Sequence, residues 1–237
     1  GGKTTFACGL MQALINRGLR VQACKCGPDY IDPLFHREVV GAPSRNLDLF
    51  FMNAEQVRGL VAKGATDADI TVIEGVMGYY DGIALGDEAS SWDVARVTDT
   101  PVVLVVDTAG QARSLAALVK GFVEFRTPSQ VAGVVLNRTS AALYPRLKRA
   151  VEDECGIPVL GYLVDLPECA LQSRHLGLVA AAEVDDLRGK LNRLAQALEE
   201  TVDIDGLLAL ARTAPVIDVA PEVLPEPVEG KPVIAVA

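Results

Sequence analysis

Apolar residues follow two alternating patterns along the chain. Short runs rich in β-branched residues alternate with longer segments in which apolar residues recur every three or four positions. The five strand-like runs are RVQACK (20–25), ITVIEGV (70–76), PVVLVVD (101–107), VAGVVLN (131–137) and IPVLGYL (157–163). Strands without polar alternation, separated by amphipathic helices, are typical of a parallel sheet that is covered on both faces. We therefore expect an α/β fold with a mostly parallel sheet and helices on both faces.

Longer segments with a helical period separate and follow these runs. They cover residues 4–17, 111–125, 144–155, 183–200 and 203–212. The segment 183–200 places apolar residues on one face, as in an amphipathic helix that packs on a core. These residues are Val184, Leu187, Leu191, Leu194 and Leu198. We expect the last two helices to complete one domain, residues 1–213.

The composition changes after residue 213. Residues 214–232 hold five prolines and several acids without a helical or strand period, which is typical of a stiff, extended linker. The run VIAVA at 233–237 then predicts a strand that opens a second domain. Because the chain starts at Gly1, inside a phosphate-loop pattern and without a methionine, we expect the first domain to be truncated at its N-terminus.

The charge and the apolar content narrow the range of partners. The net charge is −9 at pH 7, and the Lys and Arg residues form no run that would bind nucleic acid by releasing counterions. No apolar stretch approaches the roughly 20 residues that cross a bilayer. We expect a cytoplasmic protein that binds neither nucleic acid nor membrane. The five cysteines lack the C-x-x-C spacing of zinc or redox sites, so we expect reduced, mostly packed thiols.

The first five residues, GGKTT, match the end of the phosphate-loop pattern G-x-x-x-x-G-K-[ST]. In such a loop, backbone N–H groups point at phosphate oxygens, the lysine reaches the β and γ phosphates, and the next hydroxyl binds Mg²⁺. A good helical pattern follows directly, as this function requires. The pattern predicts a nucleotide triphosphate site at Lys3 and Thr4.

A second polar cluster follows the run at 70–76. In VIEGVMGYYDG, Glu74 ends a buried strand, at the edge of the sheet where ligands bind in such folds. An acid there can hold Mg²⁺ directly or through water. The alternative is an acid that is merely solvated at a strand end. Nearby glycines at 75, 78 and 82 allow a backbone to approach a ligand closely and favour the first interpretation.

The densest cluster of ionisable residues is CKCGPDYIDPLFH at 24–36. Lys25 ends the preceding strand at the same edge of the sheet, so it can lie beside the phosphates bound by Lys3. Asp29 and Asp32 follow in a loop that two prolines stiffen. Carboxylates beside a triphosphate are repelled unless a cation lies between them, so the cluster indicates a metal or a site for an incoming amine. The alternative is an acidic turn whose Asp side chains bind local amides.

Five motifs occur in order along the chain. They are KCGPDYIDPLFH (25–36), SRNLDLFFMN (44–53), EGVMGYYDG (74–82), VVDTAGQARSLAALVKGF (105–122) and RHLGLV (174–179). Together they closely resemble the cobyrinate a,c-diamide synthase family, also called hydrogenobyrinate a,c-diamide synthase, from Gly1 to about Leu210. The resemblance implies a P-loop NTPase-like fold similar to dethiobiotin synthetase. It also implies a following class I glutamine amidotransferase domain, of which 233–237 would be the first strand.

The resemblance further implies an ATP- and Mg²⁺-dependent ligase. Such an enzyme amidates the a and c carboxylates of cobyrinic or hydrogenobyrinic acid, a corrinoid, in cobalamin biosynthesis. Glutamine, through the glutaminase domain, or free ammonia would supply the nitrogen. Because a carboxylate resists attack by ammonia, ATP would first convert it to an acyl phosphate, with Lys3, Lys25 and Mg²⁺ stabilising the transferred phosphoryl.

The functional residues of the family carry over position by position. The residues expected to bind nucleotide are Gly2, Lys3, Thr4, Thr5, Lys25 and, by analogy with dethiobiotin synthetase at the adenine edge, Asn137. The residues expected to bind magnesium are Thr4, Asp48 and Glu74. The expected catalytic residues are Lys25, Asp29, Asp32, Glu74 and Asp81. Tyr30 matches a residue next to the corrinoid.

Several alternatives remain open. Nickel-sirohydrochlorin a,c-diamide synthase shares these motifs and differs in the ring that it amidates. A partitioning-type ATPase also begins G-G-x-G-K-T-T, but it needs a basic surface or an amphipathic tail and lacks GPDYIDP. Cobyric acid synthase is a third candidate, and a homodimer is the candidate assembly. His36 and His175 are expected to hold a loop or touch substrate rather than act as general bases.

Overall fold

The strands form two parallel sheets of three strands each. The computed structural model describes residues 2–169 and 181–219. The sheets have the orders β2-β1-β3 and β4-β5-β6, and all pairings within them are parallel. The strands are β1 (Val21–Cys26), β2 (Ser44–Leu47), β3 (Ile70–Glu74), β4 (Val102–Asp107), β5 (Val131–Asn137) and β6 (Val159–Leu163). The predicted α/β fold class is confirmed.

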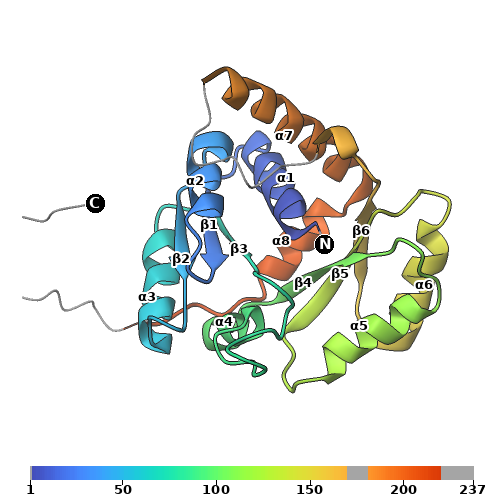
Figure 1. The fold of residues 1–237 in the computed structure, drawn as a ribbon, viewed down its shortest axis with the longest axis horizontal. Helices are drawn as coiled ribbons and strands as arrows, with labels where there is room; N and C mark the ends of the chain where they lie inside the picture. Colours follow the sequence, from blue (N-terminus) through green and yellow to red (C-terminus); the bar gives the residue numbers. More distant parts are fainter. Residues whose placement is uncertain (1, 170–180, 220–237) are drawn as a thin grey trace, which may run out of the picture.

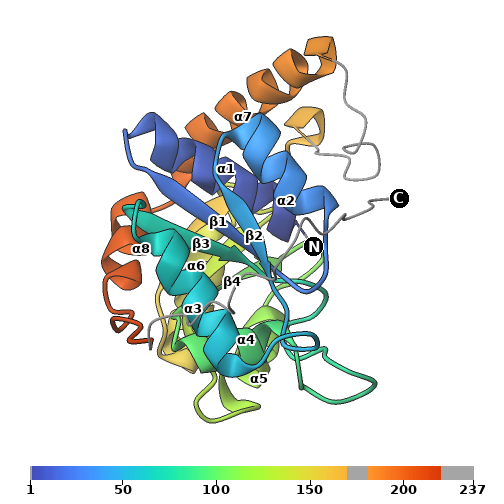
Figure 2. The same ribbon diagram turned by 90° about the vertical axis from the view of Figure 1, so that its left-hand side faces the viewer.

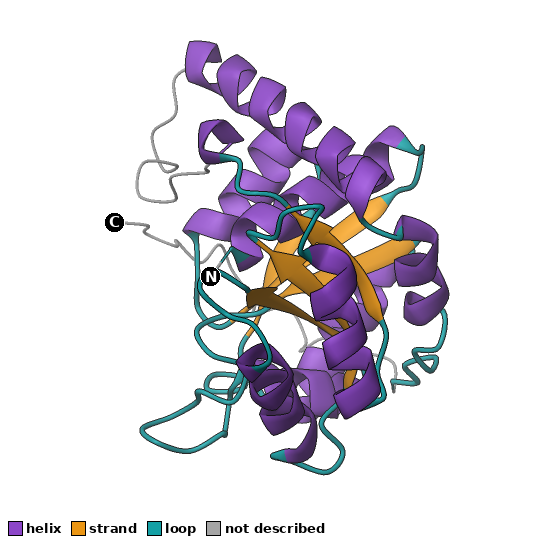
Figure 3. Ribbon diagram, turned by 90° about the vertical axis from the view of Figure 1, so that its right-hand side faces the viewer, coloured by secondary structure: helices purple, strands orange, loops and turns teal. Residues whose placement is uncertain are grey.

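Helices cover both faces of the strands (Figure 1). The α-helices are α1 (Lys3–Asn16), α2 (Ile31–Phe35), α3 (Ala54–Ala65), α4 (Ser91–Thr98), α5 (Ser114–Glu124), α6 (Tyr144–Cys155), α7 (Ala181–Thr201) and α8 (Ile204–Ala211). A π-helical turn, η1 (His36–Val40), and a 3₁₀ turn, η2 (Pro167–Cys169), complete the set. α1 and α7 lie on one side of the strands, and α3 to α6 lie on the other (Figures 1 and 2). Figure 3 shows the strands enclosed between these helical layers.

The burial of β1 explains its sequence pattern. All six residues of the strand are buried. Val21 and Ala23 pack into the cluster formed with α1 and α7, whereas Cys24 and Cys26 pack into a cluster with α3 and α4. A strand that is buried on both faces cannot alternate with polar residues, which is why the run reads as continuously apolar. Only Gln22 and Lys25 interrupt it.

One apolar cluster joins the two sheets. Ala23 of β1 and Val135 of β5 belong to the same cluster as Met11 and Leu14 of α1. α1 therefore packs across both sheets, and its amino end reaches the carboxyl edge of each. This position explains how residues of β3 and β5, far apart in the sequence, come to lie beside the same helix end.

The predicted elements are confirmed, but the strand β2 and the helices α2, α3 and α4 were not predicted. Each of the five predicted strands and five predicted helices corresponds to an observed element within a few residues. The omitted strand is β2, whose four residues begin Ser44, Arg45 and Asn46 and give no apolar run. It forms because it pairs in parallel with β1. No helix in residues 2–169 and 181–219 is both long and apolar enough to cross a bilayer. The motif at 174–179 and the strand predicted at 233–237 lie outside the described residues.

Candidate active site

The amino end of α1 has the features of a phosphate site. Gly2 has a φ of 100°, in the left-handed region that favours glycine, and the helix begins at Lys3. The free N–H groups and the dipole of a helix start attract phosphate. The Lys3 Nζ atom donates to the carbonyl oxygen of Met77 at 2.7 Å, which holds this ammonium group at the same edge. These features agree with the phosphate loop predicted at Gly2, Lys3 and Thr4.

A buried network of charges adjoins the helix start. Thr4 Oγ1 donates to Glu74 Oε1 at 2.5 Å, and Lys25 Nζ donates to the same oxygen at 2.8 Å. Lys25 Nζ also lies 2.6 Å from Asp32 Oδ2. The side chains of Lys25 and Glu74 are only 5% and 1% exposed. The alternative of a solvated acid at Glu74 is therefore wrong, and one lysine is shared by two carboxylates.

The network holds Lys25 and Glu74 in their charged forms. Burial by itself would raise the pKa of Glu74, but the hydrogen bond with His36 and the charge of Lys25 outweigh it and lower the pKa below its ordinary value. Burial likewise opposes the charged form of Lys25, but the carboxylates of Glu74 and Asp32 raise its pKa above the ordinary value. The Lys25 ammonium and the Glu74 carboxylate are thus kept ionised within a mostly apolar surrounding.

His36 supports Glu74 from the opposite side. Its Nε2 atom lies 3.1 Å from Glu74 Oε2, and its Nδ1 atom lies 3.1 Å from Ser44 Oγ. Since the Glu74 carboxylate can only accept, His36 Nε2 is the donor in this contact. His36 is fully buried. The expectation that it holds local structure agrees with these contacts. Its partner Ser44 begins the motif at 44–53 but was not predicted as a site residue.

The remaining predicted acids have different surroundings. Asp29 Oδ1 accepts from the N–H groups of Ile31 and Asp32 at 2.8 and 3.2 Å, and so caps the start of α2. Asp81 is exposed and accepts from the N–H of Gly78 at 2.8 Å. The alternative interpretation of an acidic turn therefore describes Asp29, whereas Asp32 belongs to the buried network.

A cavity of about 590 Å³ opens beside this network. Its lining comes from the loops after β1, β2 and β3. The lining residues are Cys26, Gly27, Pro28, Asp29, Tyr30, Asp48, Phe50, Phe51, Val76, Met77, Asp81, Gly82, Ile83 and Ala89. Tyr30 is 77% exposed at this cavity. The structure thus brings the predicted residues Asp29, Tyr30, Asp48 and Asp81 to one space.

Asp48 is nearly buried, with one carboxyl oxygen lacking a partner. Oδ1 accepts from the N–H of Phe50 at 2.9 Å, while Oδ2 is inaccessible and has no hydrogen bond. Oδ1 of Asn46, two residues earlier, is in the same state, although Asn46 Nδ2 donates to the Asp29 carbonyl at 2.5 Å. A buried polar atom without a partner costs about 1–3 kcal/mol, so both atoms are unfavourable in these positions. No hydrogen bond joins Asp48 to Thr4 or Glu74 among the described residues, and its role in binding metal stays a prediction.

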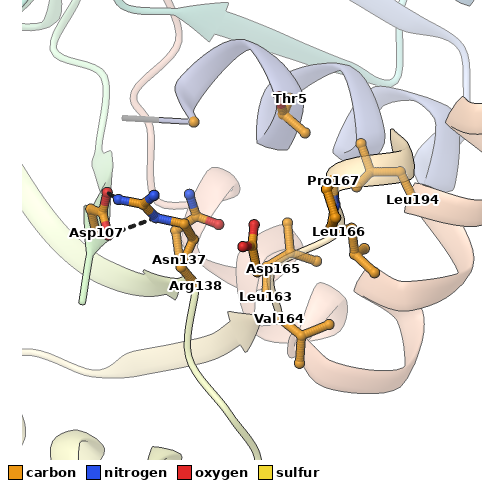
Figure 4. A pocket seen from close by; sticks show the side chains of 11 residues that line it. Thr5, Asp107, Asn137, Arg138, Leu163, Val164, Asp165, Leu166, Pro167 and Leu194 are labelled. Atoms are coloured by element: carbon orange, nitrogen blue, oxygen red, sulfur yellow. Dashed lines mark hydrogen bonds and ion pairs between the residues drawn. The ribbon is translucent and has the colours of Figure 1, made fainter. Parts of the chain in front are cut away.

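A second cavity, of about 280 Å³, lies between α1 and the ends of β5 and β6 (Figure 4). Its lining includes Gly2, Thr5 and Asn137, three of the residues predicted to bind nucleotide. Arg138 and Asp107 form an ion pair here that the sequence analysis missed. Asp107 ends the run PVVLVVD at the ligand edge, a signal that could have identified it.

The cysteines beside Lys25 are inert. Burial raises the pKa of the Cys24 and Cys26 thiols to about 12, so they are protonated at neutral pH. The described part of the chain contains only free cysteines, most of them buried, which agrees with the expectation of packed thiols.

The residues at the helix start suit a magnesium ion. Mg²⁺ is usually bound by one or two carboxylates together with phosphate oxygens and water. The Thr4 hydroxyl and the Glu74 carboxylate already lie in contact at the phosphate loop. No cluster of three His, Cys, Asp or Glu side chains with metal-binding geometry occurs in residues 2–169 and 181–219.

Curated relatives support the resemblance seen in the motifs. The chain is 43% identical over 237 residues to cobyrinate a,c-diamide synthase of Priestia megaterium, a match that covers 99% of this chain and 51% of that protein. It is 42% identical over 212 residues to hydrogenobyrinate a,c-diamide synthase of Mesorhizobium japonicum, covering 89% and 48%. The predicted resemblance is confirmed, and the chain spans about half the length of these relatives.

Solved structures and a family model agree on the fold. The MinD cell division protein of Aquifex aeolicus matches with a TM-score of 0.54 and 15% identity, covering 88% of this chain and 92% of that one. Chloroplast FtsY of Physcomitrella patens matches with a TM-score of 0.53 and 17% identity, covering 81% and 62%. These likenesses show the fold alone. The model of the CobQ/CobB/MinD/ParA nucleotide binding domain matches residues 1–178, and the chain belongs to this family.

Proposed function

We propose that this chain is the ATP-using part of a cobyrinate or hydrogenobyrinate a,c-diamide synthase. In this role it amidates the a and c carboxylates of a corrinoid in cobalamin biosynthesis. The names of relatives at 42–43% identity support the proposal. The observation that carries it is the contact of Thr4 in the phosphate loop with Glu74, which also holds Lys25. This contact joins a phosphate site to a buried cation.

The chain's residues suit the activation of a carboxylate by phosphoryl transfer. Lys3 and Lys25 would balance the negative charge that spreads over the transferred phosphoryl oxygens. Magnesium, held by the Thr4 hydroxyl and Glu74, would neutralise further phosphate charge when bound. Asp32 and His36 position these groups, since Asp32 contacts Lys25 and His36 contacts Glu74. Asp48 as a further magnesium ligand remains a prediction.

The reaction has two steps. A substrate carboxylate oxygen attacks the γ phosphorus of ATP, the bond to ADP breaks, and ADP leaves with the bonding electrons. The lone pair of ammonia then attacks the carbonyl carbon of the acyl phosphate. Phosphate leaves with its bonding electrons, and the nitrogen loses one proton to become the amide. Groups fixed in a water-poor site stabilise such charges better than solvent does.

The substrates are assigned by position and by chemistry. ATP would extend from the helix start into the smaller cavity, where Asn137 lies with Thr5. The corrinoid would enter the larger cavity, where the exposed ring of Tyr30 can pack on a macrocycle. In family members a glutaminase domain supplies ammonia from glutamine. We infer the same arrangement here from the greater length of the relatives.

The test is ATP-dependent trapping of the activated carboxylate. The intact natural protein is incubated with cobyrinic acid, Mg-ATP and hydroxylamine, and the hydroxamate is measured by mass spectrometry. We expect hydroxamate and ADP in equal amounts, and none without ATP. The same assay with nickel sirohydrochlorin separates the alternative substrate, because a faster reaction on that ring would reassign the function. If hydroxamate forms with neither cobyrinic acid nor nickel sirohydrochlorin, the proposal is refuted.

A further inference from the structure

The loop between β3 and α4, residues 75–90, supplies one part of the lining of the larger cavity. We call it the cavity loop. Its two ends are tied together, because Ser91 Oγ accepts from the N–H of Val76 at 2.9 Å and lies 3.1 Å from the carbonyl oxygen of the same residue. The residues that it contributes to the lining are Val76, Met77, Asp81, Gly82, Ile83 and Ala89.

Three residues of the cavity loop have a backbone conformation that side-chain-bearing residues rarely adopt. Met77, Ala84 and Ala89 have φ values of 49°, 55° and 58°, in the left-handed region. Such conformations persist only where the surrounding structure fixes them. Met77 and Ala89 also line the cavity. The shape of this part of the lining therefore depends on contacts between the loop and the rest of the fold.

Three aromatic side chains in and beside the cavity loop bond to one short segment near the second sheet. Their donor groups all reach backbone carbonyls within residues 122–129, at the end of α5 and in the connection to β5. We call residues 122–129 the anchor segment. The bonds run from Tyr79 Oη to Ser129 at 2.7 Å, from Tyr80 Oη to Phe122 at 2.6 Å and from Trp92 Nε1 to Pro128 at 3.0 Å.

Ring contacts and an ion pair add to these hydrogen bonds. The ring centroid of Tyr80 lies 6.1 Å from that of Phe122, with the two rings nearly parallel at 12°. It lies 5.0 Å from the centroid of Phe125. Arg126 Nε lies 2.5 Å from Asp87 Oδ2, a half-exposed pair between the anchor segment and the cavity loop. Tyr80 thus joins the loop to α5 through both its hydroxyl and its ring.

The cavity loop connects the anchor segment with the proposed reacting centre. Tyr80 and Asp81 are neighbours in the chain, but Tyr80 bonds to α5 whereas Asp81 lines the cavity. Met77 lines the cavity too, and its carbonyl accepts from Lys3. The rest of the lining comes from the loops after β1 and β2, which belong to the first sheet. The contact with α5 therefore helps to set how the two parts of the lining lie relative to each other.

We propose that Tyr80 is a positioning residue for the corrinoid, because its contacts with the anchor segment hold the cavity loop in the form that binds the ring. The inference rests on the proposed amidation. It adds that binding of the corrinoid depends on α5, a helix that contributes no residue to the lining of the larger cavity. When a smaller fraction of the protein has the binding-competent form, the apparent affinity falls in proportion. The smaller cavity contains no residue of the cavity loop, so ATP binding should be far less sensitive.

The test is the KM for cobyrinic acid, measured by hydroxamate formation in the intact natural protein. Tyr80→Ala removes both the hydroxyl and the ring and should raise this KM about tenfold, while the KM for ATP stays within about twofold. Tyr80→Phe keeps the ring contacts and should raise the KM for cobyrinic acid only about two- to threefold. In the described part of the chain Tyr80 belongs to none of the buried apolar clusters, so both variants should fold.

The matched control is Tyr144→Ala. Tyr144 is a partly buried tyrosine at the start of α6, and its ring stacks on Tyr162 with centroids 4.5 Å apart. This variant also loses a ring contact, so it reports what a general loss of stability does to the kinetics. Its KM for cobyrinic acid should stay within about twofold of the parent. An equal rise in Tyr144→Ala and Tyr80→Ala would overturn the positioning role.

A charge exchange tests the contact from the other side. Asp87→Lys places like charges together at Arg126 and should raise the KM for cobyrinic acid about threefold. Adding Arg126→Glu to the same chain restores an ion pair with the signs exchanged, and the KM should return to within about twofold of the parent. A double variant that is no better than Asp87→Lys alone would count against the anchor segment.

The outcomes separate this inference from the proposed function. If the parent forms no hydroxamate, the proposed function fails and the positioning role fails with it. If the parent forms hydroxamate and Tyr80→Ala keeps the parent KM for cobyrinic acid, only the positioning role fails. If the KM for ATP rises as much as the KM for cobyrinic acid, the effect is not specific to the corrinoid and the proposal is overturned.

Discussion

Two ion pairs occupy the ligand edge of the fold, one in each sheet. Lys25 and Glu74, at the ends of β1 and β3, are buried and joined by Thr4, Asp32 and His36. Arg138 and Asp107, at the ends of β5 and β4, are 47% and 25% exposed. The topology is similar at the two places, but the surroundings differ. One pair is enclosed by protein, and the other borders the smaller cavity.

The difference in burial indicates that the two ion pairs have different roles. A buried ion pair costs desolvation and is sensitive to the loss of either partner, but it holds charges in fixed positions. An exposed pair contributes little to stability and can exchange partners when a ligand arrives. We therefore expect the first sheet to hold the reacting groups and the second to adapt to the nucleotide.

The largest effect is expected from Lys25→Met. The variant leaves the carboxylates of Asp32 and Glu74 buried without their shared cation, which should cost about 3–5 kcal/mol of unfolding free energy. The melting temperature should fall by roughly 6–20 °C. Amidation should fall by a factor of about 1,000 through lost phosphoryl stabilisation. A variant that melts like the parent would show that the pair is less enclosed than its geometry indicates.

The pH dependence of stability sharpens the same point. The lowered pKa of Glu74 stabilises the fold at pH values above 4.5, the ordinary pKa of a glutamate. This stabilisation is lost as the pH falls through the folded-state pKa. The raised pKa of Lys25 stabilises the fold at pH values below 10.5, the ordinary pKa of a lysine. This stabilisation is lost as the pH rises through the folded-state pKa. Melting curves of Lys25→Met across this range should lack the alkaline loss that the parent shows.

Glu74→Gln should have the next largest effect. Gln keeps the shape of the side chain but removes its charge, and its NH₂ group would face the donors Thr4 and Lys25. The free energy of unfolding should fall by about 1–3 kcal/mol. Amidation should fall by about 100-fold, since a fixed charge beside the phosphates is lost. The control is Glu124→Gln, whose exposed pair with Lys120 spans 3.8 Å and should matter little. An equal loss of activity in both variants would contradict the assignment.

Gly2→Ala tests how closely α1 approaches β5. A Cβ at Gly2 would overlap the side-chain amide of Asn137, and the φ of 100° disfavours alanine. We expect the KM for ATP to rise about tenfold. Gly59→Ala is the matched control, because a Cβ at that helical position contacts nothing and should stabilise the helix by about 0.5–1 kcal/mol. Normal ATP kinetics in Gly2→Ala would place the nucleotide elsewhere.

The smallest effect is expected from Arg138→Gln. Because the pair with Asp107 is exposed, unfolding free energy should change by less than about 1 kcal/mol. The KM for ATP should rise only about two- to fivefold, measured by coupled ADP detection. If this variant loses as much stability as Lys25→Met, the contrast between the two edges is wrong.

The sequence by itself determined five of the strands and five of the helices, and it indicated the candidate site residues. The run 131–137 reads as a strand because five of its seven residues are buried, so its apolar pattern is local information. In the run 101–107 only Leu104 and Val106 are buried and the other residues of the strand are partly buried, yet the run of β-branched residues is still recognisable. Lys3, Thr4 and Glu74 were recognisable because a phosphate loop and the end of a parallel strand have local signatures. β2 escaped prediction because its polar residues form a strand only by pairing with β1.

Only the tertiary structure decided how these residues are combined. Lys25 and Glu74 are 49 residues apart, and their contact depends on the register of β1 with β3. The sharing of Lys25 with Asp32, the support from His36 and the unpartnered oxygen of Asp48 depend likewise on which faces meet after folding. A residue's type shows what bonds it can form, but burial and neighbours decide which bonds form and which remain open to a ligand.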